Sequence, residues 1–250
     1  MLTKARIRLV RSLADKEARR DNGLFVVEGA KMVAEALNSS ASVEAVYFVP
    51  GGKSGGWEAR GGEAVSHADM ERMSSLKTPS DVLAVVRIPE IRGSRKYGSG
   101  LALFLDGVQD PGNLGTIIRI ADWFGICDVV CSLDSADCYN PKVVQATMGA
   151  VFRVNVSYAC LVDELGAARA SGTEVYGTFL EGEDIYSTGL SSDGIVLMGS
   201  EGHGVSPEAS AFVTRKLFIP PFPADRRGSE SLNVAAATAL VCAEFRRRIR

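Results

Sequence analysis

In residues 101–250, long runs of apolar residues alternate with segments in which polar residues interrupt the apolar ones. Runs such as LALFLD, GIVLMGS and KLFIP contain almost no polar position, which is typical of parallel strands that are covered on both faces. The pattern predicts strands at 101–106, 128–132, 152–156, 173–179, 194–199 and 216–220, and helices at about 113–124, 141–150, 161–170, 207–213 and 231–248. We therefore expect an α/β domain with a parallel sheet, whose ligands bind beyond the carboxyl ends of the strands.

A smaller unit precedes this domain. Its pattern predicts a small α/β/α arrangement over residues 1–88, with a helical N-terminus at about 2–20, helices at 30–40 and 67–75, and strands at 24–29, 43–50 and 82–88. The stretch 89–100 has no apolar periodicity and is rich in glycine and cations. We expect it to be a linker between two domains.

Composition narrows the class of protein. The chain of 250 residues is 46% hydrophobic, enough to bury a full core. No stretch approaches the roughly 18 consecutive apolar residues that span a bilayer, and the N-terminus alternates arginine with apolar residues. The five cysteines are odd in number and contain no C-x-x-C pair, which disfavours a disulfide framework and a zinc site. We expect a soluble cytoplasmic protein without a metal.

Charge is distributed unevenly although the net charge is only −2. Residues 1–88 carry 13 basic and 11 acidic side chains, whereas residues 101–250 carry 12 and 18. Within residues 1–20, only two acidic side chains oppose Lys4, Arg6, Arg8, Arg11, Lys16, Arg19 and Arg20. This cluster has the charge to meet phosphates, and a solvated helix face explains it equally well.

Three segments that follow apolar strands carry the candidate chemistry: GVQDPGNLGTIIR (107–119), GSEGHGVSPE (199–208) and IPPFPADRRGSESLNVAAATA (219–239). The glycines of the second segment allow backbone to approach a ligand closely, although it matches neither G-x-G-x-x-G nor a P-loop. In the third segment, Ser231 is the predicted N-cap of the last helix and Asn233 falls in its first turn. Arg119 lies among isoleucines, where it either serves a site or pairs with a carboxylate such as Glu201.

Together, N-x-G-x-x-x-R in 113–119, G-S-E-G-x-G in 199–204 and S-L-N-V in 231–234 resemble the three motifs of the SpoU (TrmH-type) RNA methyltransferases of the SPOUT superfamily. The resemblance covers residues 101–250. The stretch VVEGAKMVAEAL (26–37) is similar to the first strand and helix of the small RNA-binding domain that precedes the catalytic domain in many members.

The resemblance implies a fold, a reaction and a cofactor. The fold is a parallel sheet with a C-terminal trefoil knot, one of the exceptions to the rule that chains stay unknotted. The reaction transfers a methyl group from S-adenosylmethionine to a ribose 2′-hydroxyl of structured RNA, either rRNA or tRNA. Homodimers form through the catalytic domain. The implied cofactor pocket consists of Thr178, Met198, Gly199, Ile219, Ser231 and Leu232.

The resemblance also assigns the catalytic positions, which are Asn113, Arg119, Glu201, Ser231 and Asn233. Arg119 is expected near the target hydroxyl, held by Asn113 and Glu201. Since an arginine has a pKa above about 12, we favour a role in binding the adjacent phosphate and stabilising a developing alkoxide. The expected RNA contacts are Arg6, Arg8, Arg11 and Arg119, with Arg226 and Arg227 of the long 220–230 loop as further candidates.

Two alternatives stay open. The same scaffold supports methylation of a base, and a chain that had lost its chemistry would act as an RNA-binding factor. All five polar positions of the motifs are present, which argues against the second alternative.

Overall fold

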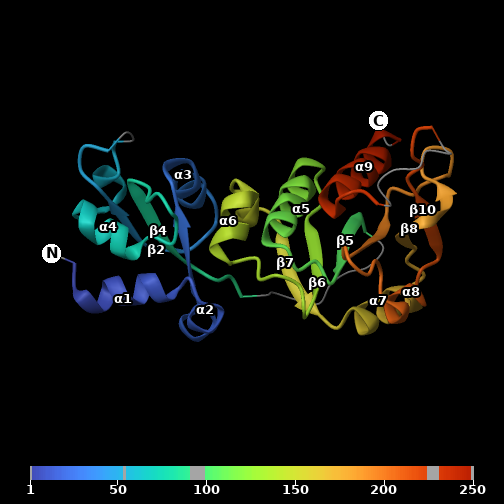
Figure 1. The fold of residues 1–250 in the computed structure, drawn as a ribbon, viewed down its shortest axis with the longest axis horizontal. Helices are drawn as coiled ribbons and strands as arrows, with labels where there is room; N and C mark the ends of the chain where they lie inside the picture. The colour runs from blue at the N-terminus through green and yellow to red at the C-terminus, as the bar shows by residue number, and fades with distance from the viewer. Residues whose placement is uncertain (1, 53–54, 91–98, 224–230, 249–250) are drawn as a thin grey trace. The chain divides into compact units, whose positions relative to one another are not determined.

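The computed structural model describes residues 2–52, 55–90, 99–223 and 231–248 (Figure 1). The chain divides into two compact units, one formed by Met1–Ile91 with Asp137–Arg153 and the other by Arg92–Ala136 with Val154–Arg250. The segment Asp137–Arg153 lies in the second domain by sequence but belongs to the first unit in space. The boundaries 1–88 and 101–250 stay predictions, and most of the 89–100 linker lies outside the described residues.

The first unit contains a mixed four-stranded sheet in the order β1-β4-β2-β3. Strand β4 runs antiparallel to both of its neighbours, and β3 is parallel to β2. The strands are β1 (Leu24–Glu28), β2 (Val43–Phe48), β3 (Glu63–Ala64) and β4 (Val82–Arg87). The helical segments are α1 (Lys4–Ser12), α2 (Lys16–Asn22), α3 (Ala30–Asn38), η1 (Glu58–Arg60), α4 (His67–Met73), α6 (Pro141–Thr147) and η2 (Ala150–Phe152).

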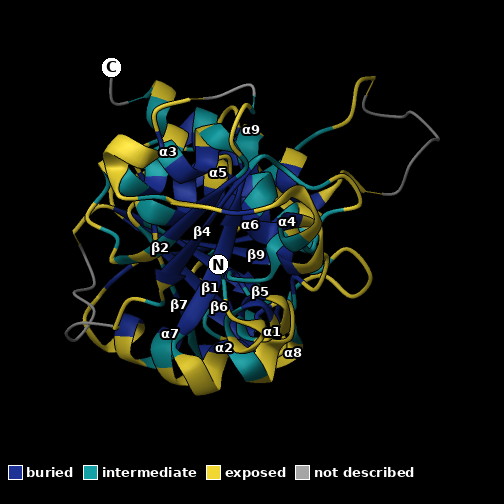
Figure 2. Ribbon diagram, turned by 90° about the vertical axis from the view of Figure 1, so that its left-hand side faces the viewer, coloured by how far each residue is buried: buried dark blue, intermediate teal, exposed yellow. Residues whose placement is uncertain are grey.

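Helices cover both faces of this sheet, which buries every residue of β1. Phe25 and Val27 face a core that includes Val33 of α3 and Val144 of α6. The alternate residues of β1 face a second core that includes residues of α1 and α4. In Figure 2, β1 and β4 are drawn in the dark blue of buried residues. This arrangement is the small α/β/α unit that the sequence predicts.

The predicted helical N-terminus at about 2–20 consists of two helices. Helix α1 ends at Ser12, and Asp15 starts α2 by accepting hydrogen bonds from the backbone N–H groups of Glu17 at 2.9 Å and Ala18 at 3.3 Å. An aspartate in this position is a strong N-cap, so the break is built into the sequence.

The second unit contains a six-stranded sheet in the order β10-β8-β9-β5-β6-β7, and every pair of neighbours is parallel. The strands are β5 (Leu101–Asp106), β6 (Asp128–Ser132), β7 (Asn155–Ala159), β8 (Val175–Asp184), β9 (Gly194–Gly199) and β10 (Arg215–Phe218). The helices are α5 (Pro111–Trp123), α7 (Leu161–Ala170), α8 (Pro207–Ser210) and α9 (Val234–Arg247). The predicted parallel sheet is confirmed.

Helices α5 and α9 lie side by side on one face of this sheet, and α7 and α8 lie on the other (Figure 1). The central strands β5 and β9 are therefore covered on both sides. Phe104 of β5 packs against Leu165 of α7 and Ala209 of α8, while Leu103 and Leu105, on the opposite side of the strand, are also fully buried. Burial on both faces explains the unbroken apolar runs in the sequence.

Two strands differ from their predicted positions. The strand expected at 152–156 is β7 at Asn155–Ala159, because Phe152 ends a 3₁₀ turn and packs in the core of the first unit. Strand β8 extends to Asp184 instead of ending near residue 179, and its pairing with β10 jumps from Gly177 to Glu183. The last helix begins at Val234, three residues after the predicted start.

Two other expectations concern the whole chain. No helix in the described ranges combines the length and the apolarity that a membrane span requires. Within the same ranges, no group of three or more histidine, cysteine or acidic side chains is arranged to hold a metal ion. The trefoil knot involves the chain between β10 and α9, of which residues 224–230 lie outside the described residues, and it stays a prediction.

Candidate active site

The candidate site lies at the carboxyl ends of β5 and β9, which are neighbours in the middle of the sheet. The segment after β5 turns into α5, and the segment after β9 forms the loop 200–206. Because α9 packs beside α5, the start of α9 reaches the same edge of the sheet. The topology therefore gathers all three sequence motifs.

The first turn of α5 fixes the position of Asn113. Asp110 is the N-cap and accepts a hydrogen bond from the backbone N–H of Asn113 at 2.8 Å. Pro111 occupies the first helical position, where its fixed φ suits the helix and its missing N–H costs nothing. The D-P-G-N sequence thus presents the amide of Asn113 at the helix N-terminus.

The side-chain amide of Asn113 connects the three motifs. Its Nδ2 donates to Oε1 of Glu201, and its Oδ1 accepts from Nδ2 of Asn233 at 2.9 Å. These partners are 88 and 120 residues away in the sequence. The N-termini of α5 and α9 both lie beside this network, and their dipoles favour the negative charge of Glu201.

Asn233 also starts α9. Its Oδ1 accepts hydrogen bonds from the backbone N–H groups of Ala235 at 3.0 Å and Ala236 at 3.2 Å. The prediction that Ser231 is the N-cap was wrong, because the N-cap is Asn233, two residues later, and its side chain caps the helix. Ser231 and Leu232 are exposed just before the cap.

The loop that carries Glu201 is held in a tight turn. Ser200 and Gly204 exchange backbone hydrogen bonds of 3.0 and 2.9 Å, and the N–H of His203 donates to Oγ of Ser200 at 3.3 Å. A Cβ atom on Gly199 would overlap the backbone of Gly204 and Val205. Glycine at position 199 is therefore required by close backbone approach.

Arg119 lies apart from this hydrogen-bond network. It is exposed on α5, on the same helical stripe as Thr116 and Trp123, which are also exposed. Among the described residues it has no hydrogen-bond or ion-pair partner, and Glu201 bonds Asn113 instead of Arg119. The simple ion pair between Arg119 and Glu201 is thus not formed, and the guanidinium is free to meet a ligand.

The structure places some of the residues expected around the cofactor close together. Oγ1 of Thr178 on β8 lies 3.3 Å from the carbonyl oxygen of Leu197 and 3.6 Å from Sδ of Met198 on β9, and Gly199 follows directly. Ile219 is half-buried after β10. Residues 224–230 of the β10–α9 connection, which include Arg226 and Arg227, lie outside the described residues.

Two polar residues at this edge were missed from the sequence. Oδ2 of Asp106 accepts the backbone N–H of Ser206 at 2.7 Å, which ties the end of β5 to the loop after β9. Oγ of Ser132 accepts the backbone N–H of Gly107 at 2.8 Å and donates to Asp134 at 2.6 Å. Each is the last residue of an apolar strand, and that position was the signal available.

Comparison with protein families defines the class. Residues 100–243 match the model of the SpoU rRNA methylase family, and residues 4–84 match the model of the MRM3-like substrate binding domain. The chain belongs to the SpoU rRNA methylase family, a class of RNA methyltransferases that use S-adenosylmethionine. The family predicted from the three motifs is confirmed.

Individual relatives are similar over nearly the whole chain. The 23S rRNA (guanosine(2553)-2′-O)-methyltransferase RlmP of Bacillus subtilis is 31% identical over 244 residues, which cover 94% of each protein. A protein described as an RNA methyltransferase of the TrmH family from Porphyromonas gingivalis has a solved structure that is 40% identical, with a TM-score of 0.87 and 99% of both chains covered. An AdoMet-bound rRNA methyltransferase from Sinorhizobium meliloti is 28% identical, with a TM-score of 0.82 and coverage of 100% of this chain and 97% of that one.

Proposed function

We propose that the protein transfers the methyl group of S-adenosylmethionine to a ribose 2′-hydroxyl of ribosomal RNA. The observation that carries the proposal is the bonding of Asn113 to both Glu201 and Asn233, which unites the three motifs at one edge of the sheet. Family membership and the similarity to RlmP support the reaction and the class of RNA. A tRNA substrate stays open within the same proposal.

The residues at the ends of β8 and β9 suit the cofactor. Thr178, Met198 and Gly199 combine a hydroxyl, a buried apolar side chain and backbone without a Cβ, a set that fits an adenosine group. We assign Ile219, Ser231 and Leu232 to the same pocket. When it is bound, S-adenosylmethionine supplies a methyl group activated by its sulfonium sulfur. The role of the protein is to align the hydroxyl oxygen with that methyl carbon, and alignment alone contributes several kcal/mol.

Arg119 is assigned to the RNA backbone. Its guanidinium is exposed and unpaired among the described residues, so it can form two parallel hydrogen bonds to a phosphate. The same charge stabilises the alkoxide that develops as the hydroxyl loses its proton. Asn113, Glu201, Ser231 and Asn233 would position the ribose.

The position of the methyl group tests the reaction. Unmodified 23S rRNA transcript is incubated with the protein and labelled S-adenosylmethionine, digested to nucleosides and analysed by mass spectrometry. A label on ribose, accompanied by local resistance to alkaline cleavage, is expected. A label on a base would replace the proposal with base methylation. Failure to bind S-adenosylmethionine in calorimetry would favour a binding factor without chemistry.

Replacement of Arg119 by alanine tests its role. Methyl transfer should fall by about 100-fold or more, since one charged group that stabilises the transition state is lost. Affinity for S-adenosylmethionine should stay within about twofold. The matched control is Arg169→Ala, which removes an exposed arginine from α7 on the other face of the sheet. Near-normal turnover of Arg119→Ala in single-turnover assays would contradict the assignment.

We further propose that the protein forms a homodimer through α5 and α9. Trp123 on α5 is 84% exposed and Leu240 on α9 is 41% exposed, although both are large and apolar. An exposed tryptophan on a pair of adjacent helices is a common feature of interfaces. Arg119 lies one turn from Trp123 on the same helix face, so a partner subunit would lie close to the site.

Light scattering after size-exclusion chromatography tests the dimer. We expect a dimer mass for the wild-type protein and a monomer mass for Trp123→Glu, because a carboxylate would be buried without a partner. The control Val162→Glu places the same charge on α7, on the opposite face, and should leave the mass unchanged. A monomeric wild-type protein would contradict the proposal.

We also propose that the second unit contains the trefoil knot and that the protein is cytoplasmic.

A further inference from the structure

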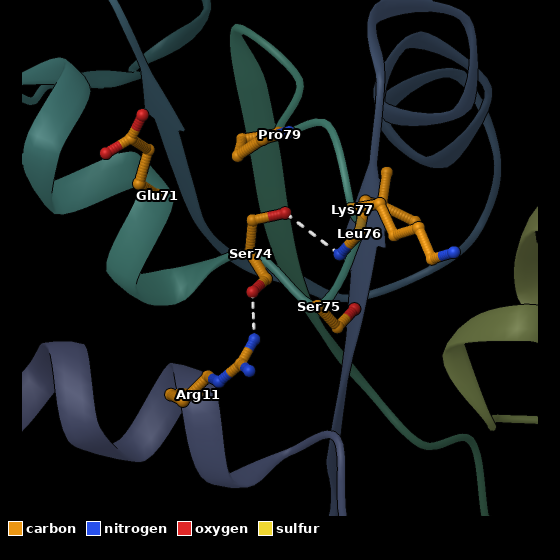
Figure 3. A pocket seen from close by; sticks show the side chains of 7 residues that line it. All are labelled: Arg11, Glu71, Ser74, Ser75, Leu76, Lys77 and Pro79. Atoms are coloured by element: carbon orange, nitrogen blue, oxygen red, sulfur yellow. Dashed lines mark hydrogen bonds between the residues drawn. The ribbon is translucent and has the colours of Figure 1, made fainter.

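A pocket of about 460 Å³ in the first unit is not part of the site described above. It lies between α1, which contributes Arg11, α4, which contributes Glu71, and the segment 74–79 that follows α4 (Figure 3). Its volume falls within the range of roughly 300–1,000 Å³ that is usual for sites of small organic ligands. A single nucleotide is a ligand of this size.

A buried carboxylate holds the segment 74–79 that lines this pocket. Glu28, only 3% exposed, accepts hydrogen bonds from Oγ of Ser74 at 2.5 Å, from the N–H of Ser75 at 2.9 Å and from its Oγ at 2.8 Å. Oγ of Ser74 in turn accepts from the N–H of Leu76 at 3.1 Å. The segment is held in place before any ligand arrives, which reduces the entropy cost of binding.

Positive charge leads into the pocket along α1. Ile7 and Val10 face the core, so the helical period places Lys4, Arg8 and Arg11 together on the exposed face. The guanidinium of Arg11 donates one hydrogen bond to the carbonyl of Ser74, visible in Figure 3, and an arginine has five N–H donors. Arg11 is therefore oriented toward the pocket with donors to spare. By contrast, Nε of Arg6 donates to the hydroxyl of Tyr47 at 2.7 Å.

The opposite side of the pocket combines a second cation with apolar surface. Lys77 adds an ammonium group, and Leu76 and Pro79 offer aliphatic surface. Glu71 is the one carboxylate among the lining residues, and it lies 3.3 Å from Nδ1 of His67. The pocket can thus hold a phosphate on Arg11 and a planar group against the aliphatic side chains, while Glu71 accepts from an amino or hydroxyl group. The side chain of Lys77 extends away from Arg11 (Figure 3), so its ammonium group can meet the next phosphate of the same strand.

We propose that this pocket binds one unpaired nucleotide of the substrate RNA, with one of its two flanking phosphates on Arg11, the other on Lys77, and its base against Leu76 and Pro79. Recognition of unpaired nucleotides through phosphate contacts and the faces of bases is a general mode of RNA binding. The identity of the ligand as RNA rests on the proposed function. The pocket lies wholly within residues 4–84, which match a substrate binding domain.

The test compares Lys77→Gln with Lys31→Gln in the full-length protein. Lys31 is an exposed lysine on α3, which packs on the other face of the sheet from α1 and α4. Binding to an unmodified 23S rRNA transcript is measured by filter retention over a range of salt concentrations. Lys77→Gln should weaken binding about three- to tenfold and reduce the slope of log K against log salt by roughly 0.7, the value for one contact to single-stranded RNA. Lys31→Gln should match the wild type.

Equal effects of the two substitutions, or an unchanged salt slope for Lys77→Gln, would overturn the proposal. A second readout is crosslinking to a transcript that contains 4-thiouridine: a crosslink on residues 74–79 is expected, and its absence while other parts of the protein crosslink would count against the pocket. Both readouts measure RNA binding without turnover. A methyl group found on a base would therefore disprove the proposed reaction and leave the pocket to be judged by its own test.

Discussion

At the scale of single residues, the site depends on the two ends of one amide. Asn113 uses its nitrogen for Glu201 and its oxygen for Asn233, so neither aspartate nor leucine of similar size can replace it. An aspartate would present a second negative charge to Glu201, and a leucine would leave both partners without a hydrogen bond. The positioning of three motifs thus depends on a side chain that donates from one atom and accepts at another, as an amide does.

Substitutions of Asn233 should separate its two tasks. Asn233→Ala removes the cap of α9 and should lower the free energy of unfolding by about 1 kcal/mol. Asn233→Asp keeps a capping oxygen and should restore that stability, but its carboxylate cannot donate to Asn113, so methyl transfer should remain impaired. Denaturant titration and single-turnover assays measure the two effects. Full activity in the aspartate variant would show that the amide donor is dispensable.

The sequence identified the residues of this network but not their pairing. Asn113, Glu201 and Asn233 follow from the motifs, whereas neither Asn113 nor Glu201 forms a hydrogen bond with Arg119 among the described residues. Ser231 and Asn233 are equally good caps by residue type. The choice between them is made by the contact of Asn233 with Asn113 in the folded domain, which local sequence cannot reveal.

At the scale of elements, the loop after β9 is shaped by one steric requirement. Gly199 passes so close to the backbone of Gly204 that no side chain fits, and the reciprocal hydrogen bonds between Ser200 and Gly204 close the turn. Glu201 sits at the tip of this turn, and Thr178 and Met198 lie beside its base. Loop geometry therefore controls both the position of the Glu201 carboxylate and the proposed cofactor pocket.

A pair of glycine substitutions tests this requirement. Gly199→Ala forces backbone apart and should lower stability by more than about 2 kcal/mol and weaken S-adenosylmethionine binding at least tenfold. Gly202→Ala, three residues away in the same loop, meets open space and should behave like the wild type. Calorimetric binding and thermal unfolding are the measurements. Similar behaviour of the two variants would mean that the loop can rearrange.

Most elements could be placed from periodicity, and the exceptions have physical causes. Strands β5, β6 and β9 fall where the apolar runs predict them. Strand β7 does not, because Phe152 packs in the core of the first unit, where its ring centroid lies 6.4 Å from that of Phe25. The polar end of β8 carries no apolar signal and is extended because Glu183 and Asp184 pair with β10.

At the scale of the whole molecule, charged contacts attach the end of α9 to the chain after β8. Glu244 pairs with Arg247 and Arg248 at 2.8 and 2.7 Å, and Arg248 donates to the carbonyl groups of Ile185, Tyr186 and Thr188. Hydrogen bonds from Arg247, and then from Arg248, lower the pKa of Glu244 from 4.5 to about 2.

This lowered pKa predicts an acid-dependent loss of stability. A carboxylate whose pKa is lower in the folded state stabilises the fold fully above its ordinary pKa of 4.5, and the effect fades as the pH falls toward 2. Glu244→Gln should therefore be less stable than the wild type at pH 7, by roughly 1–2 kcal/mol, and the difference should shrink between pH 4.5 and 2.5. Denaturant titrations across this range check the prediction, and a difference independent of pH would contradict it.

The packing of Asp137–Arg153 in the first unit limits where the protein can be truncated. The ring centroid of Tyr139 lies 4.7 Å from that of Phe25, and the amide of Gln145 donates to the backbone carbonyl of Glu28. A truncation that begins at residue 101 would strip these groups of their partners and uncover Val144. The second domain therefore cannot simply be produced alone from residue 101. A usable fragment would need Asp137–Arg153 redesigned with polar residues on the surface that now packs in the first unit.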